Sequence, residues 1–185
     1  MKTLDQSYYC GASTTQIIYE TIGVYFDRIC NQYPDKDALI VRHQDVRWTY
    51  RELQEKVDAL AVGLLSLGIA PGDRVGIWGP NSHEWVMVQL ATAKIGAIMV
   101  CINPAYRLYE LEFALNKVEC KVVITAEAFK TSDYLGMLNT LAPELANSKP
   151  GALQAEKLPH LRTVVRMGTA ETVGMLNFGA VCGLG

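Results

Sequence analysis

The clearest pattern in the chain is an alternation of short apolar runs with amphipathic stretches between residues 71 and 125. Apolar runs of strand length occur at Arg74–Trp78, Ala97–Ile102 and Lys121–Thr125. Between them lie two stretches with helical character, from about His83 to Ile95 and from about Leu108 to Lys117. Connections of this length allow right-handed crossovers between parallel strands. The pattern therefore predicts a β-α-β-α-β unit.

Strands that are apolar throughout are typical of a sheet that helices cover on both faces. We therefore predict an α/β fold with an open, mostly parallel sheet. Open sheets of this kind bind ligands beyond the carboxyl ends of their strands. Here those ends are Gly79–Ser82, Asn103–Tyr106 and the residues after Thr125.

The first 70 residues predict a helix, a hairpin and a second helix. The first helix is expected from about Thr15 to Asn31, with an apolar stripe and a weak capping box formed by Ser13 and Gln16. Its stripe consists of Ile18, Ile22, Tyr25 and Ile29. Short strands are expected at Ala38–Val41 and Val46–Thr49, with Arg42–Asp45 as their turn.

The second helix has the stronger signal. Thr49 and Glu52 have the spacing of a capping box, and Gly68 is placed to end the helix. Between them, apolar residues recur at alternating steps of four and three, which predicts one buried face. These residues are Leu53, Val57, Leu60, Leu64 and Leu67.

The last 60 residues carry a weaker pattern. We expect a helix from about Ala126 to Leu145, a loop-like stretch over Pro143–Pro159 and one more strand at Leu161–Met167. Glycines interrupt the apolar residues that follow.

Composition supports a single domain with a core. The chain has 185 residues, half of them apolar, which is enough for one core and too few for two substantial domains. A net charge of −2 gives no electrostatic footprint for nucleic acid. No apolar run is long enough to span a membrane, and Met1–Gln6 lacks the apolar core of a secretory signal. We therefore expect a cytoplasmic location, with the mitochondrial matrix as the alternative.

Five cysteines stand at positions 10, 30, 101, 120 and 182, and no C-x-x-C occurs. An odd number without metal-binding spacing argues against a disulfide framework and a zinc site. Cys101 and Cys120 lie in or beside apolar runs. We expect inert thiols in the core.

Neither G-x-x-x-x-G-K-[ST] nor G-x-G-x-x-G occurs, so an ordinary dinucleotide site is not expected. The loop Gly79–Ser82 precedes a helix and is a candidate anion site, although a tight turn with Asn81 or Ser82 as helix cap is the favoured interpretation. His83 beside Glu84 is a weaker catalytic candidate. Candidate residues near the ligand crevice are Pro80, Asn81, Ser82, His83, Asn103, Pro104, Tyr106 and Arg107.

Two further interpretations stay open at this point. Tyr106 and Arg107 would either stack on or clamp a ligand, or anchor their loop against the next helix. The three histidines are far apart in the sequence and have no metal-ligand pattern near them, and no G-x-S-x-G nucleophile elbow occurs. The residues alone therefore predict a ligand crevice without identifying its ligand.

Several segments together resemble the N-terminal region of adenylate-forming enzymes, the AMP-binding superfamily of acyl-CoA synthetases and luciferases. Their order and spacing carry the resemblance. The longer run from Ser7–Tyr9 through Lys149–Leu153 most resembles the fatty-acyl-CoA synthetases grouped with acyl-CoA synthetase family member 2. The segments are Trp48–Leu53, Leu67–Val75, Pro80–Trp85, Gly96–Ala97, Asn103–Tyr106 and Glu110–Leu111.

The resemblance implies an ATP- and Mg²⁺-dependent fatty acid–CoA ligase, which converts a carboxylate into an acyl-adenylate and then into a CoA thioester. Such chemistry needs groups that hold the charge of the leaving pyrophosphate. It also implies that residues 1–185 form an incomplete N-terminal AMP-binding domain. Its parts are a helix, hairpin and helix in 1–70, a β-α-β-α-β core in 71–145, and a loop, strand and truncated tail in 146–185.

The family's phosphate loop, ribose-binding Asp and catalytic Lys do not occur in this sequence. The resemblance therefore implies that no catalytic residue lies in this chain, which by itself is expected to be inactive and to bind none of ATP, Mg²⁺ or CoA. The complete enzyme would take a fatty acid or another carboxylic acid, ATP and CoA, and is a candidate homo-oligomer. The alternative is a stand-alone, non-catalytic module that binds an acyl ligand or a partner.

Overall fold

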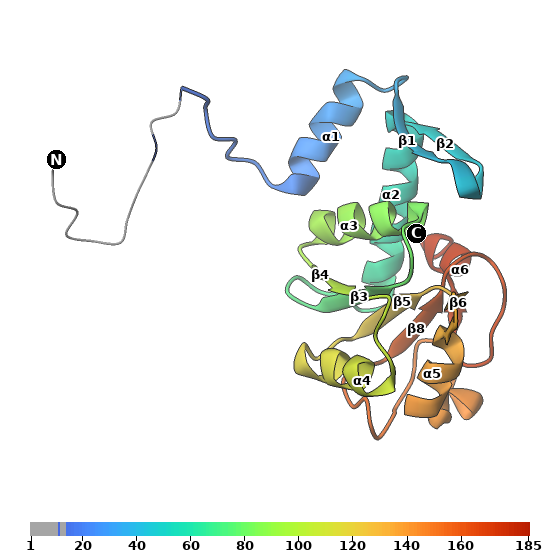
Figure 1. Cartoon of the computed structure of the whole chain (residues 1–185). Coiled ribbons are helices and arrows are strands. Elements are labelled where there is room, and N and C mark those ends of the chain that lie inside the picture. The colour runs from blue at the N-terminus through green and yellow to red at the C-terminus, as the bar shows by residue number, and fades with distance from the viewer. Residues whose placement is uncertain (1–10, 12–13) are drawn as a thin grey trace, which may run out of the picture.

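The computed structural model describes residue 11 and residues 14–185. A parallel sheet lies at the centre, and helices cover both of its faces (Figure 1). Before the sheet, the chain forms α1 (Ile22–Gln32), β1 (Asp37–Val41), the 3₁₀ turn η1 (Arg42–Gln44), β2 (Val46–Thr49) and α2 (Tyr50–Ser66). The next elements are β3 (Arg74–Trp78), α3 (His83–Ile95), β4 (Ile98–Ile102), α4 (Leu108–Lys117) and β5 (Val122–Thr125). The last are β6 (Ala128–Phe129), β7 (Ser132–Asp133), α5 (Tyr134–Leu141), η2 (Pro143–Asn147), β8 (Thr163–Arg166), β9 (Leu176–Asn177) and α6 (Phe178–Cys182).

The central sheet has five strands in the order β4-β3-β5-β8-β9, and every neighbouring pair is parallel. In its middle, Ile77 of β3 is aligned with Cys101 of β4 and with Ile124 of β5. The chain leaves β3 toward β4 and then crosses back to β5. The strand order therefore reverses between β3 and β5, which is where open α/β sheets place their ligands.

Two hydrophobic cores lie on opposite faces of this sheet. On one face, Val75 and Ile77 of β3 pack in a cluster with Val57 and Leu60 of α2, to which α1, α3 and α6 also contribute. On the other face, Trp78 packs in a cluster with residues of α4 and α5. The predicted open, mostly parallel sheet with helices on both faces is confirmed.

Predictions with local signals were accurate. The helix His83–Ile95 and the strand Arg74–Trp78 have their predicted bounds, and the hairpin turn lies at residues 42–45. The Thr49 hydroxyl accepts a hydrogen bond from Glu52 N at 3.3 Å, while the Glu52 carboxylate accepts one from Thr49 N at 2.8 Å. The capping box is confirmed.

The prediction for the first helix was wrong in its start and in its buried face. The helix starts at Ile22, with Thr21 rather than Ser13 as N-cap, and Ser13 lies outside the described residues. Ile18 and Ile22 are 58% and 62% exposed. The buried positions are instead Gly23, Phe26 and Cys30. Close packing determines which face of α1 is buried. A Cβ at Gly23 would lie 3.0 Å from Lys94 Cα of α3, so only a residue without a side chain allows this contact.

The helix expected over Ala126–Leu145 was also wrong. The segment opens with the short antiparallel hairpin of β6 and β7, whose turn includes Lys130 with a φ of 54°. The Asp133 carboxylate then accepts a hydrogen bond from Gly136 N at 2.9 Å and starts α5. A capping carboxylate competes with helix continuation, and it begins a new helix here. The glycine-containing tail adds β9 and α6, which the pattern did not predict.

The cysteines divide into two groups. Cys30 and Cys120 are 1% exposed, and burial raises the pKa of the Cys30 thiol to about 11 and that of Cys120 to about 12. Both are the inert core thiols that were expected. Cys101 is exposed on β4, so its assignment to the core was wrong, because β4 is an edge strand. Cys182 is half-buried, and Cys10 lies outside the described residues.

Among the described residues, no helix has both the length and the apolar character that crossing a bilayer requires.

Candidate functional site

The point where the strand order reverses is packed closed. Ala126 N, after β5, donates a hydrogen bond of 3.0 Å to Trp78 O at the end of β3. A Cβ added to Gly79 would lie 3.0 Å from the Ala126 Cβ. The two loops that would border a crevice are therefore in direct contact, and glycine at position 79 is what allows them to approach.

The amino end of α3 is occupied by the hairpin. Ser82 is the N-cap residue, but its hydroxyl makes no capping hydrogen bond. Instead Gln44 Oε1, from η1, accepts a hydrogen bond from His83 N at 2.8 Å. The same side chain donates to Glu84 Oε2 at 3.0 Å. An anion would have to compete here with Gln44 and with the buried Glu84 carboxylate. Pro80 is half-buried and Asn81 is exposed in the same loop.

His83, in the first turn of α3, is half-buried. Its side chain is 22% exposed, and Trp48 contacts its ring edge-on at 5.0 Å between ring centroids. His83 Nδ1 lies 3.3 Å from Glu84 Oε2 but makes no hydrogen bond. Burial lowers the pKa of His83, with the Glu84 charge opposing the shift and Lys56 and His43 adding to it. The ring is therefore neutral at physiological pH.

We expect acid to destabilise the protein through His83. Because its pKa is lower in the folded chain, the unfolded chain takes up a proton first, and stability falls as pH drops below about 6.5. The stabilising contribution is complete above the unfolded-state pKa and is lost as pH falls toward the folded-state value. Urea unfolding between about pH 8 and pH 5 would show this loss, and H83Q should flatten it. H160Q, at an exposed histidine, is the control, and an unchanged slope in H83Q would contradict the assignment.

The loop after β4 is anchored through its backbone. Asn103 O accepts a hydrogen bond from Trp78 Nε1 at 3.1 Å, and the Asn103 side chain accepts one from Ala105 N at 2.9 Å. The Tyr134 hydroxyl donates to Pro104 O at 2.7 Å. Side chains from β3 and α5 therefore hold the backbone of this loop in place.

Tyr106 and Arg107 follow in the same loop. Tyr106 is half-buried against the core shared by α4 and α5. The Arg107 guanidinium donates to Thr131 Oγ1 at 3.2 Å, in the turn between β6 and β7. These contacts anchor the loop, although Arg107 reaches the turn between β6 and β7 rather than the next helix as expected. Arg107 remains exposed, so its outer surface is accessible.

Two charged groups at the same edge were missed by the sequence reasoning. Arg166, at the end of β8, donates to Thr172 Oγ1 at 3.1 Å and forms an ion pair of 2.5 Å with Glu127, after β5. Gln44 was missed as well, because it is 39 residues from the helix end that it caps. No local signal marks Glu127 or Gln44 as partners, since Glu127 is 39 residues from Arg166 and Gln44 is 39 residues from His83.

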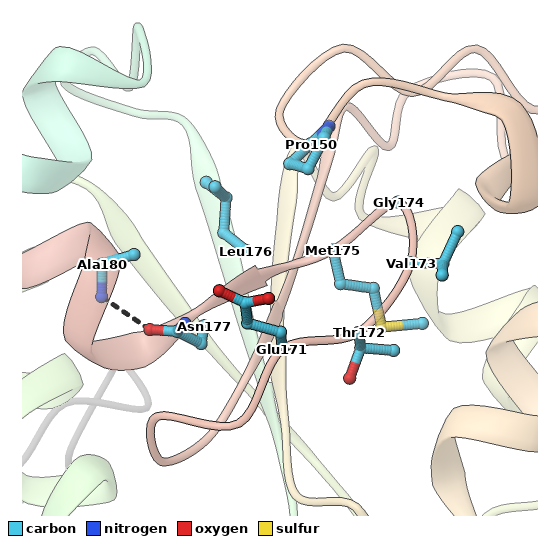
Figure 2. A pocket seen from close by; sticks show the side chains of 9 residues that line it. All are labelled: Pro150, Glu171, Thr172, Val173, Gly174, Met175, Leu176, Asn177 and Ala180. Carbon is cyan, nitrogen blue, oxygen red and sulfur yellow. Dashed lines mark hydrogen bonds between the residues drawn. The ribbon is translucent and has the colours of Figure 1, made fainter.

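Next to this edge, the loop before α6 borders a hollow of about 460 Å³ (Figure 2). Its two uncharged polar side chains, Thr172 and Asn177, are already engaged. Thr172 accepts from Arg166, and Asn177 Oδ1 accepts from Ala180 N at 2.7 Å. The Glu171 carboxylate is exposed. The hollow therefore offers little that would fix the orientation of a ligand.

The residues described do not fit a divalent cation. Within residues 14–185, no three His, Cys, Asp or Glu side chains gather as metal ligands. At the carboxyl edge, Glu84 is bound by Gln44 and Glu127 by Arg166. We therefore assign no chemical step in this chain to Mg²⁺.

Comparison with known proteins identifies the family. The model of the AMP-binding enzyme family matches residues 26–178. The chain is 45% identical to the mitochondrial medium-chain acyl-CoA ligase ACSF2 of Mus musculus over 86% of this chain and 26% of that protein. The Danio rerio protein of the same name is 42% identical over 88% of this chain and 27% of its own length. This chain thus spans about a quarter of the curated relatives that it matches.

A solved structure confirms the fold. The anthranilate CoA ligase AuaEII, in complex with anthranoyl-AMP, has a TM-score of 0.74 at 23% identity, over 90% of this chain and 28% of that one. With its parallel sheet, its helices on both faces and the match over residues 26–178, the chain belongs to the AMP-binding enzyme family and corresponds to the N-terminal region of its acyl-CoA ligases.

Proposed function

We propose that this chain forms the opening part of the large domain of an ATP-dependent fatty acid–CoA ligase. The complete enzyme would join a carboxylic acid to AMP, release pyrophosphate, and transfer the acyl group to the thiol of CoA. The observation that carries this proposal is the similarity to medium-chain acyl-CoA ligases over 86% of the chain. A medium-chain fatty acid is accordingly the proposed substrate class.

Within such an enzyme, we assign these residues a supporting role and no catalytic one. The candidates Asn103, Pro104 and Arg107, and the His83 backbone, are engaged by partners within this chain. Groups engaged in this way position loops, and we assign none of them a chemical step. The charge of ATP and of the leaving pyrophosphate would be held by residues outside this sequence, as would Mg²⁺. The residues 1–185 are thus proposed to be an incomplete domain, inactive by itself.

The test is a chimera in which one segment of a related ligase is replaced by the matching segment of this chain. Residues 26–178 of this chain would replace the matching region of the mouse medium-chain ligase, and the same exchange with the zebrafish region would be the control. We expect the chimera to form acyl-CoA from a medium-chain acid, ATP and CoA. We expect the 185-residue chain alone to show no acid-dependent exchange between ATP and pyrophosphate. An active control beside a folded but inactive chimera would contradict the supporting role, and exchange by the isolated chain would contradict its inactivity.

The second candidate is a stand-alone module that binds an acyl ligand or a partner without catalysis. The observation that favours it is the pair of filled cores on both faces of the sheet, which an isolated domain requires. It predicts a single cooperative melt and measurable fatty acid binding by the 185-residue chain. Calorimetric titration with a medium-chain fatty acid tests the acyl-binding form of this candidate, because the first candidate predicts no binding.

The location is part of the proposal. The mouse and zebrafish relatives are named as mitochondrial proteins, which favours the mitochondrial matrix over the cytoplasm that we expected from the sequence. Fractionation of cells that express the native gene, followed by detection of its product, would separate the two compartments.

A further inference from the structure

Helix α1 contributes little apolar surface to the core. Its buried residues are Gly23, Phe26 and Cys30, and only the last two bring apolar side chains into the cluster on that face of the sheet. Helix α2 contributes five apolar side chains to the same cluster. Because the cost of detaching an element rises with the apolar area that it buries, α1 is less firmly held than α2.

The chain on either side of α1 leaves this helix room to move. Before it, residues 14–21 are all exposed. After it, the turn that leads to β1 is bonded to α2, because Arg51 N donates to Pro34 O and Tyr50 N donates to Lys36 O, each at 3.0 Å. The turn and the hairpin can therefore stay on α2 while α1 moves about the start of this turn.

A cluster of charges supplies a further hold on α1. Lys94 Nζ of α3 lies 2.6 Å from Asp27 Oδ1 of α1 and also forms an ion pair with Asp58 of α2. Gln54 Nε2 of α2 donates to the same Asp27 oxygen at 2.7 Å. The Lys94 side chain is 14% exposed, so water screens its ion pairs less than it screens pairs at the surface. Asp27 thus joins α1 to both neighbouring helices.

Detachment of α1 would leave no charge buried without a partner. Lys94 would keep Asp58, because these two residues lie on α3 and α2, and Asp27 would move into water. The large cost of an unpaired buried charge is therefore avoided. Detachment would instead expose Phe26 and the Cys30 thiol, which is 1% exposed in the docked helix. Access to Cys30 thus reports whether α1 is docked.

We propose that α1 detaches from α2 and α3 as a unit while the central sheet stays folded, and that the ion pair of Asp27 with Lys94 limits how often this happens. Elements with few buried apolar contacts are those that open locally. In the docked state, Cys30 is both covered and held as the thiol, because burial raises its pKa to about 11. Cys30 therefore reacts through the detached state.

The experiment is labelling of the 185-residue chain with iodoacetamide under native conditions, followed by mass spectrometry of the peptides that contain Cys30 and Cys120. Cys120 is the internal reference, because a Cβ at Gly76 of β3 would lie 3.1 Å from its sulfur and the sheet must open to expose it. The reagent reacts slowly, so each rate reports the population of the open state. After division by the rate in urea, we expect Cys30 to be labelled at least about tenfold faster than Cys120.

Two variants separate local opening from global unfolding. D27N removes the charge from α1 and should speed the labelling of Cys30 by about fivefold. V164A leaves a cavity in the core on the other face of the sheet and should speed the labelling of Cys120 by at least about tenfold while Cys30 keeps its rate. The matched control is E119Q, which removes the charge of a carboxylate 2.7 Å from Arg74 and should leave Cys30 unchanged. Circular dichroism checks the fold of each variant.

Salt gives an independent test of the ion pair. Raising the ionic strength from about 0.05 M to about 0.5 M should speed the labelling of Cys30 in the unchanged chain and have less effect in D27N. Any segment packed against the outer side of α1 would stabilise docking equally in the unchanged chain and in D27N. The ratio of their rates therefore isolates the contribution of Asp27.

Three results would overturn the proposal. Equal labelling of Cys30 and Cys120 in the unchanged chain would show that α1 stays docked until the whole protein unfolds. An equal acceleration of both thiols by V164A would lead to the same conclusion. An unchanged Cys30 rate in a folded D27N variant would show that Asp27 does not hold α1. None of these measurements depends on the proposed ligase activity, because acyl transfer is not measured.

Discussion

W78A is expected to lower the free energy of unfolding of this protein by about 3–5 kcal/mol. Trp78 is fully buried at the end of β3, and its ring lies 4.0 Å from that of Tyr134 between centroids. Alanine would leave a cavity and would also remove the hydrogen bond from the indole to Asn103 O. Domains of this size are stable by about 5–15 kcal/mol, so a large share of the total would be lost.

Thermal unfolding measures this effect, and a shift of about 10 °C or more is expected for W78A. W78F keeps an aromatic ring but cannot donate to Asn103 O, so it should lose less stability than W78A. It should also make the amide hydrogens of Asn103 and of residues 105–107 exchange faster with solvent. The control is Y19A, at an aromatic side chain that is 88% exposed. If the free energy of unfolding of W78A lies within about 1 kcal/mol of that of the unchanged chain, the role given to Trp78 is contradicted.

G63A is expected to displace α6 from α2 and to cost about 2 kcal/mol. A Cβ at Gly63 would lie 2.1 Å from Val181 O and 2.9 Å from Val181 C. Both atoms belong to the backbone of α6, so no side chain can rotate to make room. Alanine favours a helix over glycine by about 1 kcal/mol, which offsets part of the cost. The steric conflict is expected to prevail because it requires a whole helix to move.

Hydrogen exchange of the α6 amides, together with the melting temperature, tests this expectation. G183A is the matched control, because its Cβ would meet nothing closer than 3.5 Å and Gly183 has a φ of −80° that alanine adopts readily. G183A should be neutral or slightly stabilising. Equal protection of α6 in G63A and in the unchanged chain would show that Gly63 is not required for this contact.

These two residues show how the structure is held around the candidate site. Trp78 links β3 to the loop after β4, and Gly63 allows α6 to close over α2. Neither residue is a candidate for chemistry. Both determine where the loops at the carboxyl edge of the sheet lie, which is the contribution that we propose for this chain within a ligase.

Much of the fold could be predicted from local signals. β3 and α3 had their predicted bounds because a turn precedes the strand, a loop rich in polar residues separates the two, and Gly96 ends the helix in a left-handed conformation. The capping box of α2 is a four-residue motif and needs no tertiary contact. Each of these signals acts within a few residues, so the sequence alone carries it.

The errors share a different origin. The apolar stripe proposed for α1 had regular spacing, but the buried face is the one where Gly23 allows contact with Lys94. The ion pairs of Lys94 with Asp27 and Asp58 tie α1 and α2 to α3 and fix that face. Likewise, the sequence analysis assigned Gln44 only to the hairpin turn. Its side chain accepts a hydrogen bond from His83 N, 39 residues away, at the start of α3.

By itself, the sequence determined the alternation of strands and helices and the parallel sheet, because periodicity, caps and turns are local and apolar strands require cover on both faces. The family resemblance rests separately on the order and spacing of the motif segments. Only the tertiary structure decided which face of α1 is buried, that the reversal point between β3 and β5 is closed by Ala126 packed against Gly79, and that β4 is an edge strand of the sheet formed by the described residues. These features depend on contacts between residues distant in the sequence, where close packing selects one arrangement among several that the local pattern permits.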